Sequence, residues 1–330
     1  MIPKDSGFSL VSVIVPVYNP GPYFTPFLSS LQAQSWQNWQ AILVDDGSTD
    51  GSGEAADAIA RIDRRFTVIH QANRGAAAAR AAGAAAASGN YLIFVDSDDL
   101  MHPDMLQILA NGCIRYRAEL AFCRFSPFTG QPKAEETISR TGKPMPGLQA
   151  QKMLLHDQRL DYALSNKLFS RKVITPDMLE SPYRYNEDLL ASWRAFAGVK
   201  TAVFFDFAGY HCRQHAGSTS HKGITLPFLN DQLSVAKLIL RDSQGTPMQQ
   251  SAEAFYYEKL LYLESMILRT AANPAFAELH QTLKSELRAR YSAALHNDDI
   301  GPGILLCAVF SRRLHWAWHL ACRTLLRDKR

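Results

Sequence analysis

Acidic residues follow two short apolar runs of the sequence, at positions where a strand would end. They are Asp45 and Asp46, after the run 41–44, and Asp96, Asp98 and Asp99, after the run 91–95. Ligands of an α/β sheet bind at the carboxyl ends of its strands, so these side chains should converge on one edge. Converging carboxylates repel one another unless a cation or the donor groups of a ligand compensate their charge. The spacing therefore predicts a ligand site, although one such carboxylate by itself more often caps the next helix.

Strand and helix patterns alternate through the first third of the chain. Continuous β-branched runs predict buried strands at 11–17, 41–44, 66–70 and 91–95, and the stretches between them predict helices at 23–34, 52–64 and 75–87. Strands separated by helices imply right-handed crossovers and a mainly parallel sheet. The expected fold class is therefore α/β.

The later sequence mixes short elements and then becomes helical. Residues 125–150, rich in Pro, Gly and Thr, predict a loop or a short hairpin insertion. The other expected elements are helices at 149–156 and 186–197, strands at 166–169 and 201–207, and long helices over 226–241, 248–271 and 274–295.

The composition excludes several classes of protein. The chain has 330 residues, of which 47% are hydrophobic and 20% charged, so most of it is neither disordered nor a coiled coil. A net charge of +4 is too weak to argue for nucleic-acid binding, and none is expected. No secretory signal is visible, and no apolar stretch reaches the about 18 residues of a membrane-spanning helix. Five cysteines without a CxxC spacing predict reduced thiols and a cytoplasmic location.

Six short segments carry a more specific signal together than any of them does alone. They are VSVIVPVYN at 11–19, ILVDDGSTDGS at 42–52, NRG at 73–75, SGNYLIFVDSDD at 88–99, NKLFSRKVI at 166–174 and NEDLL at 186–190. In order and spacing this set resembles glycosyltransferase family 2, over about residues 9–222. The resemblance implies an inverting enzyme of the GT-A fold that transfers a hexosyl or N-acetylhexosaminyl group from a nucleotide-sugar. Residues 1–222 would form its catalytic domain, with a nucleotide-sugar half over 1–100 and an acceptor half over 101–222.

Asp96, Ser97 and Asp98 look like the DxD element of that family. A carboxylate can hold a nucleoside diphosphate only through a hard divalent cation, Mn²⁺ or Mg²⁺, which takes oxygen ligands. The resemblance makes Asp98 the metal ligand and places Asp96 nearer the ribose or the sugar. The alternative, that Ser97 to Asp99 cap a helix beginning near Pro103, is plausible for Asp99.

Further residues match family positions around the base and the ribose. They are Pro16, Tyr18, Asp45, Asp46 and Ser48. An aromatic ring such as Tyr18 can stack on uracil, and a carboxylate can accept the N–H of that base. The alternatives are a tyrosine at the edge of the core and, for Asp45, a structural cap.

Two arginines lie close to a departure from the family pattern. Arg74 offers a fixed donor fork to a phosphate or a base, and a solvated surface arginine fits its position almost as well. The family commonly has Asn where this chain has Ala81, so one polar contact near the donor is missing relative to the family. Arg80 is expected to hold the aspartate cluster in place.

The acidic pair Glu187 and Asp188 matches the acceptor side of the family site. Inverting transfer needs one base to take the proton of the acceptor hydroxyl. The match makes Asp188 that base and gives Glu187 an orienting role, whereas the alternative is that both favour the start of a helix through its dipole. Downstream, Arg213 or His215 would neutralise charge on the departing nucleotide.

The C-terminal region 223–330 is expected to be mostly helical, and its last segment stands apart. Residues 304–330 combine six Lys or Arg with one acid, Asp328, and include Trp316 and Trp318. This pattern is typical of a segment on an anionic membrane, here the inner face of the cytoplasmic membrane. A terminal helix packed on the fold with a basic outer face predicts the same pattern.

The leading hypothesis is therefore a metal-dependent glycosyltransferase that uses a UDP-sugar. Its acceptor would be a glycan or a lipid-linked molecule in the synthesis of a bacterial surface polysaccharide. The alternatives are a pseudoenzyme or scaffold that binds nucleotide-sugars, and a nucleotidyltransferase. A nucleotidyltransferase would usually carry a Gly-rich, basic loop after its first strand, which Tyr18, Asn19 and Pro20 do not form.

Overall fold

The computed structural model describes residues 9–132, 140–156, 162–215, 223–270 and 273–313, together with Trp318 and Cys322. Contacts within the chain divide it into two compact units. The first comprises Met1–Pro182 and Glu187–Thr219, and the second comprises Tyr183–Asn186 and Ser220–Arg330. The domain boundary expected at residue 222 lies outside the described residues, and the division of 1–222 into two halves stays a prediction.

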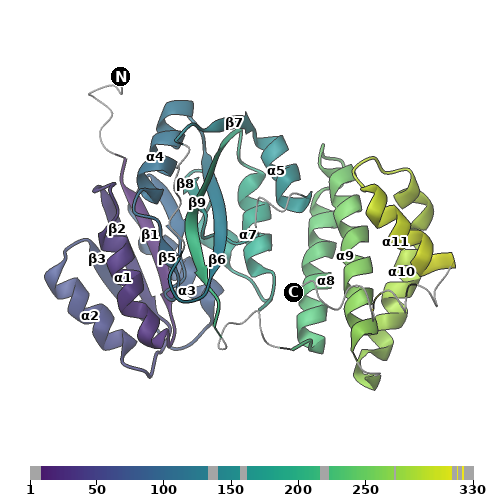
Figure 1. Cartoon of the computed structure of the whole chain (residues 1–330), viewed down its shortest axis with the longest axis horizontal. Helices are drawn as coiled ribbons and strands as arrows, with labels where there is room; N and C mark the ends of the chain where they lie inside the picture. The colour runs from purple at the N-terminus through teal and green to yellow at the C-terminus, as the bar shows by residue number, and fades with distance from the viewer. Residues whose placement is uncertain are drawn as a thin grey trace. The chain divides into compact units, whose positions relative to one another are not determined.

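One sheet runs through the first unit (Figure 1). In the described part of the chain it has nine strands in the order β3-β2-β1-β4-β8-β6-β9-β5, with β7 paired to β9. The strands are β1 (Val11–Val17), β2 (Trp39–Asp45), β3 (Phe66–His70), β4 (Tyr91–Phe94), β5 (Leu100–Met101), β6 (Leu120–Phe128), β7 (Lys143–Pro146), β8 (Lys167–Ser170) and β9 (Thr201–Arg213). The helices of this unit are η1 (Gly21–Tyr23), α1 (Phe24–Gln32), α2 (Ser52–Ile62), α3 (Ala76–Ala86), α4 (Met105–Tyr116), α5 (Gly147–His156), α6 (Pro176–Leu179) and α7 (Glu187–Phe196).

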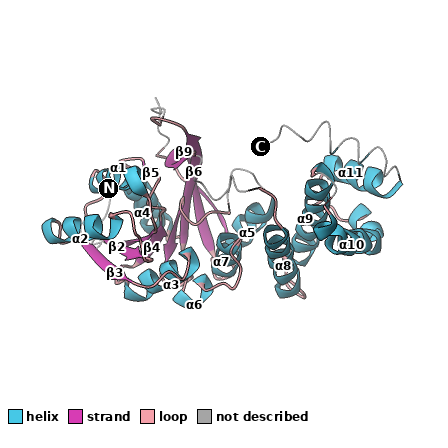
Figure 2. Cartoon of the chain, turned by 90° about the horizontal axis from the view of Figure 1, so that it is seen from below, coloured by secondary structure: helices cyan, strands magenta, loops and turns pink. Residues whose placement is uncertain are grey.

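The first four strands form the parallel half of the sheet. β1 pairs in parallel with β2 and β4, and β2 pairs in parallel with β3. Nearly every residue of β1 is buried, as expected for a strand with helices on both faces. Helices α1, α2 and α4 pack on one face, and α3 packs on the other (Figure 2). The alternation of strands and helices predicted from the sequence is confirmed.

The alanine-rich helix α3 lies very close to the sheet. A Cβ added to Gly83 would lie 2.6 Å from Cγ2 of Ile14 and 3.2 Å from Cγ2 of Val44. Ala79 and Ala84 of the same helix are buried as well. Small side chains therefore allow the helix to approach the strands, and this approach brings its one arginine to the edge where β1 and β4 end.

The second half of the sheet is mixed. β8 runs antiparallel to β4 and β6, whereas β6 and β9 are parallel. β9 continues to Arg213, well beyond the end expected at residue 207. The loop or short hairpin insertion expected over 125–150 is wrong in two places, because β6 extends to Phe128 and because β7 pairs with β9 and not within the segment. Pairing between distant segments leaves little local signal in a short sequence rich in Pro and Gly.

The second unit is helical in its described residues, as the sequence predicted. Its elements are α8 (Leu226–Asp242), α9 (Gln249–Arg269), η3 (Pro274–Phe276), α10 (Ala277–Leu295) and α11 (Pro302–Arg313). Helix α8 begins at a capping residue, since the Thr225 hydroxyl accepts the amide of Phe228 (3.3 Å). No described helix is both long and apolar enough to cross a membrane.

Buried Glu264 of α9 connects the last helices. Its Oε2 accepts hydrogen bonds from the Ser311 hydroxyl of α11 (2.8 Å) and from the indole N–H of Trp318 (2.9 Å). Nε2 of His280 on α10 lies 3.8 Å from the other oxygen. Trp318, which the sequence suggested as a membrane-interface residue, is therefore packed inside this unit, while Trp316 lies outside the described residues.

Candidate active site

The carboxyl ends of β1, β2 and β4 meet at one edge of the sheet. Val17 at the end of β1 is in register with Asp45, and the amide of Asp46 donates to the carbonyl of Val17 (2.9 Å). On the other side of β1, the amide of Val95 donates to the carbonyl of Ile14 (3.0 Å). This pairing brings the acidic residues that follow β2 and β4 to the two sides of β1.

Asp99 is fixed by β9. The Tyr210 hydroxyl donates to Oδ2 of Asp99 (2.7 Å), and the amide of Arg213 donates to Oδ1 (2.6 Å). The same hydroxyl accepts the amide of Asp96 (3.1 Å). Burial, together with Asp96 and Asp98, raises the pKa of Asp99 to about 8. Helix α4 begins without a side-chain cap, so the alternative that Asp99 caps this helix is wrong.

Asp98, the expected metal ligand, lies beside the end of β9. Nε2 of His215 is 3.0 Å from its Oδ2, and Nε of Arg213 donates to its backbone carbonyl (2.9 Å). The Asp98 side chain is 33% exposed, so a ligand can reach it. Burial and the neighbouring Asp96 raise its pKa, and the contact with His215 offsets this only in part. Ionising these carboxyls together is therefore unfavourable in the absence of a further positive charge.

Aromatic rings hold Arg213 and His215 next to this cluster. The Arg213 guanidinium lies over the rings of Tyr23 and Phe128, 4.7 Å from each centroid. The His215 ring centroid is 4.8 Å from that of Tyr23. These ring contacts position both basic side chains beside Asp98. They depend on β9 continuing to Arg213 and not ending at residue 207 as the sequence predicted.

One buried guanidinium joins acidic residues that are far apart in the sequence. Arg80 of α3, 6% exposed, donates to Oδ1 of Asp188 (2.6 Å) and to Oδ1 of Asp96 (3.2 Å). Its Nη1 also lies 3.5 Å from Oε1 of Glu187. Burial by itself lowers the pKa of Arg80, but Asp188, Asp96 and Glu187 together raise it. Arg80 therefore holds the acidic pair of α7 beside the cluster that follows β4.

Glu187 and Asp188 occupy the first turn of α7 and are mostly buried. Burial and the charge of Asp188 raise the pKa of Glu187 to about 7, whereas Arg80 lowers it. Glu187 therefore exchanges its proton near neutral pH. The start of a helix favours carboxylates in general, but the dipole does not account for the short ion pair between Asp188 and Arg80.

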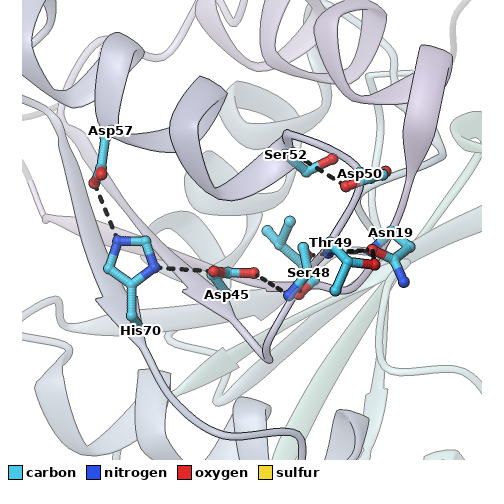
Figure 3. Close-up of polar contacts among 9 residues, drawn as sticks. Asn19, Asp45, Ser48, Thr49, Asp50, Ser52, Asp57 and His70 are labelled. Carbon is cyan, nitrogen blue, oxygen red and sulfur yellow. Dashed lines mark hydrogen bonds and ion pairs between the residues drawn. The ribbon is translucent and has the colours of Figure 1, made fainter.

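The residues expected around the base and the ribose lie where β1 and β2 end. Tyr18 is 55% exposed, and Pro16 in β1 is half-buried. The amide of Ser48 donates to Oδ1 of Asp45 (2.9 Å), and the Ser48 hydroxyl accepts the amide of Asn19 (3.2 Å; Figure 3). These hydrogen bonds connect the turn after β2 to the loop that carries Tyr18.

Asp46 is buried and binds the loop that carries Arg74. Its Oδ1 accepts from the side-chain amide of Gln71 (2.7 Å) and from the backbone amide of Arg74 (2.8 Å). Its Oδ2 accepts from the amide of Gly75 (2.8 Å). Asp46 thus positions this loop, on which the Arg74 side chain is exposed. Contact of either residue with a nucleotide stays a prediction.

Sequence reasoning missed two residues of this region. Tyr210 bridges Asp96 and Asp99, and a longer strand over 201–213 would have pointed to it. His70 at the end of β3 contacts both Asp45 and Asp57 (Figure 3). No motif signals that contact, because the three residues lie on different elements.

Comparisons with known proteins identify the family of this chain. The model of the family described as Glycosyl transferase family 2 matches residues 12–175. The putative glycosyltransferase EpsH of Bacillus subtilis is 33% identical over 257 residues, which are 76% of this chain and 72% of EpsH. The uncharacterized glycosyltransferase EpsJ of the same bacterium is 32% identical over 222 residues, which are 63% of this chain and 62% of EpsJ.

Solved structures show the same fold at low sequence identity. TarS 1–349 of S. aureus, solved in complex with UDP-GlcNAc, superposes with a TM-score of 0.68 at 17% identity, over 96% of this chain and 91% of that one. The mannosyltransferase PcManGT of Pyrobaculum calidifontis, solved with GDP-Man and Mn²⁺, gives a TM-score of 0.54 at 16% identity, over 97% and 88%. The fold is thus GT-A with C-terminal helices, and the chain belongs to glycosyltransferase family 2.

Proposed function

We propose that this glycosyltransferase moves a sugar, with inversion, from a UDP-sugar to a glycan or lipid-linked acceptor during synthesis of a bacterial surface polysaccharide. The observation that carries the proposal is the bridge that Arg80 makes between Asp96 and Asp188. It keeps a carboxylate of the donor side and one of the acceptor side within reach of a single guanidinium. Direct attack of an acceptor hydroxyl on a bound donor requires such proximity.

The acidic cluster fits a hard divalent cation, Mn²⁺ or Mg²⁺. Asp98 offers a partly exposed carboxylate whose pKa is raised by burial and by Asp96, so a cation would relieve the local repulsion. Across the described ranges, no set of three or more His, Cys, Asp or Glu side chains is placed to hold a metal ion. Such cations often take only one or two carboxylates and complete their shell with water and substrate phosphates. When bound, the cation would neutralise the diphosphate of the donor.

The side chains around the proposed cation site have different roles in the transfer reaction. Asp188 takes the proton of the acceptor hydroxyl as that oxygen attacks the anomeric carbon from the face opposite the leaving diphosphate. Arg80 keeps Asp188 in this orientation, and Glu187 orients the acceptor. Arg213 and His215 neutralise charge on the departing nucleotide.

Uracil is the proposed base of the donor, bound beside Tyr18. The exposed ring of Tyr18 can stack on a base, whereas the buried carboxylates of Asp45 and Asp46 are hydrogen-bonded within the chain and shape the loops beside it. TarS has been solved with UDP-GlcNAc and with UDP, whereas PcManGT has been solved with GDP-Man. Relatives of the same fold thus differ in their base, so the choice of uracil needs its own test.

A thermal-shift series with UDP, GDP, CDP and ADP, each with and without Mn²⁺, tests this function. UDP with Mn²⁺ should raise the melting temperature most, because a ligand that binds only the folded state stabilises it. Asp98→Ala should lose the Mn²⁺-dependent part of the shift while keeping its circular dichroism spectrum. An equal Mn²⁺-dependent shift in that variant would remove Asp98 from the metal site. No nucleotide-dependent shift in the unmodified protein would contradict the donor class itself.

We also propose that residues 304–330 attach the enzyme to an anionic membrane surface, where a lipid-linked acceptor would lie. Of these, the structure describes 304–313 in α11, Trp318 and Cys322. Leu306 of this helix is 57% exposed, and Arg313 is exposed at its end. Ser311 and Trp318 hydrogen-bond to buried Glu264. Deleting the C-terminal segment would leave that carboxylate without these partners, so point substitutions test the proposal better than a truncation.

Substituting Leu306→Asp and Arg313→Glu together should reduce co-sedimentation with vesicles that contain anionic lipid. The loss should be several-fold at low salt and smaller at high salt, since each basic residue near such a surface contributes about 1 kcal/mol and salt screens that attraction. Ile62→Asp together with Arg64→Glu, at an exposed apolar residue and an exposed arginine at the end of α2, is the control with the same change of charge. Equal sedimentation of all three proteins would leave α11 as a packed helix of the fold.

A further inference from the structure

His70 lies between two carboxylates on different elements (Figure 3). Its Nδ1 is 2.9 Å from Oδ2 of Asp45 at the end of β2, and its Nε2 is 3.2 Å from Oδ1 of Asp57 in α2. Among the described residues, these two carboxylates are the charged groups that act on the ring, one from each element packed against it.

The geometry of the ring favours its doubly protonated form. A neutral imidazole has one N–H donor and one lone pair, and the lone pair would face a carboxylate oxygen at about 3 Å. Only the doubly protonated ring donates to both Asp45 and Asp57. Consistent with this, the hydrogen bonds to Asp45 and Asp57 raise the pKa of His70, although burial lowers it.

The hydrogen bonds continue from Asp45 to the loop after β1. The other oxygen of Asp45 accepts the amide of Ser48 (2.9 Å), and the Ser48 hydroxyl accepts the amide of Asn19 (3.2 Å). Asn19 directly follows Tyr18 and has a left-handed backbone, with a φ of 51°. On the side of α2, a Cβ at Gly53 would lie 2.8 Å from Oδ2 of Asp45, so the helix backbone closely covers that oxygen.

We infer that His70 is a positioning residue of the donor site, which in its charged form clamps Asp45 so that Ser48 and Asn19 keep the Tyr18 loop in its nucleotide-binding shape. The inference rests on the proposed function, because it assumes that this loop receives the base of the donor. When His70 loses a proton, one ring nitrogen presents a lone pair to a carboxylate and the clamp weakens. Donor affinity is therefore highest below the pKa of His70 and falls as the pH rises through it.

The test is the pH dependence of UDP binding in the presence of Mn²⁺, measured by calorimetry across the titration range of a histidine. The proteins are the unmodified chain, His70→Asn and Asp57→Asn. Asparagine keeps a donor near the place of Nδ1 but carries no charge. At low pH the unmodified protein should bind UDP roughly 3–10-fold more tightly than His70→Asn, the scale of an indirectly acting charge-assisted hydrogen bond. The ratio of the two affinities should approach one at high pH. Because both proteins bind the same UDP, the titration of UDP itself does not affect this ratio.

The variant Asp57→Asn shows whether the charge of His70 or only its packing supports the donor site. It removes the outer carboxylate and leaves the contact between His70 and Asp45, so the fall in affinity should move to lower pH. The midpoint should match the pKa of His70 obtained by NMR from its ring signals in each protein. A constant affinity ratio at every pH, or a midpoint that Asp57→Asn does not move, would overturn the inference and leave the proposed function intact. Absence of Mn²⁺-dependent UDP binding in the unmodified protein at every pH would overturn both.

Discussion

Asp188→Asn is expected to reduce sugar transfer at saturating donor and acceptor by at least about 10²–10⁴-fold, the range typical of removing a general base. Asparagine keeps the shape of the side chain and can still accept a hydrogen bond from Arg80, but it cannot take the proton of the acceptor. Affinity for UDP with Mn²⁺ should change little, because Asp188 serves the acceptor side. Steady-state turnover and calorimetric binding, measured on the same preparation, check both parts.

Glu187→Gln is the matched control, since it removes one carboxylate from the same turn of α7. Its expected effect is a smaller loss of turnover and a higher KM for the acceptor. Burial and Asp188 raise the pKa of Glu187 to about 7, so this side chain becomes charged as the pH rises through neutrality. Glu187→Gln should remove any change of turnover with that midpoint.

Two results would contradict the role of Asp188. Loss of UDP affinity with normal turnover at saturating donor would assign Asp188 to the nucleotide site. Near-normal turnover and binding would leave it a carboxylate that favours the start of α7, and Glu187 would become the first candidate for the base.

Arg80→Met is expected to lower both stability and turnover. Removing one partner from a buried ion pair typically costs about 3–5 kcal/mol, and the loss here should be smaller because Asp96, Glu187 and Asp188 are partly exposed. Turnover should fall by about 10²-fold or more, since a misplaced catalytic group alone has effects of that size. Chemical denaturation and steady-state transfer measure the two effects.

Arg80→Lys separates charge from geometry. Lysine restores one positive charge, so much of the stability should return, but a point charge cannot reproduce the two-pronged contact with Asp96 and Asp188. Turnover should therefore remain well below that of the unmodified enzyme. Full turnover in Arg80→Lys would show that any cation suffices at this position, and the bridge would then have no geometric role.

Most of the parallel half and its site can be predicted from the sequence. Buried strands and intervening helices are local patterns, and ligands bind at the carboxyl ends of parallel strands, so the sequence alone predicts that Asp45 and Asp96 meet at one edge. Membership of the family is equally accessible, because the motifs at 42–52 and 88–99 are short and contiguous.

The parts of the fold and site that could not be predicted depend on pairing between segments far apart in the sequence. β7 pairs with β9, and the end of β9 delivers Tyr210 and Arg213 to the acidic cluster. Nothing local at 201–207 indicates that the strand continues to such partners. The capping role considered for Asp99 rested on its position shortly before a helix, which does not reveal its contacts with β9. The contacts of His70 with Asp45 and Asp57 could not be predicted for the same reason, since the three residues belong to three different elements.

The close packing of α3 has a consequence for how the enzyme would work. Gly83 has no room for a side chain against Ile14 and Val44, so the helix backbone packs directly on the sheet at this point. Arg80 extends from this fixed support, and its charge is therefore already in place before either substrate arrives. Enzymes gain most from electrostatic groups that need no reorganisation at the moment of reaction. In this chain that preorganisation is established during folding, by the absence of one methyl group at Gly83, one turn along the same helix from Arg80.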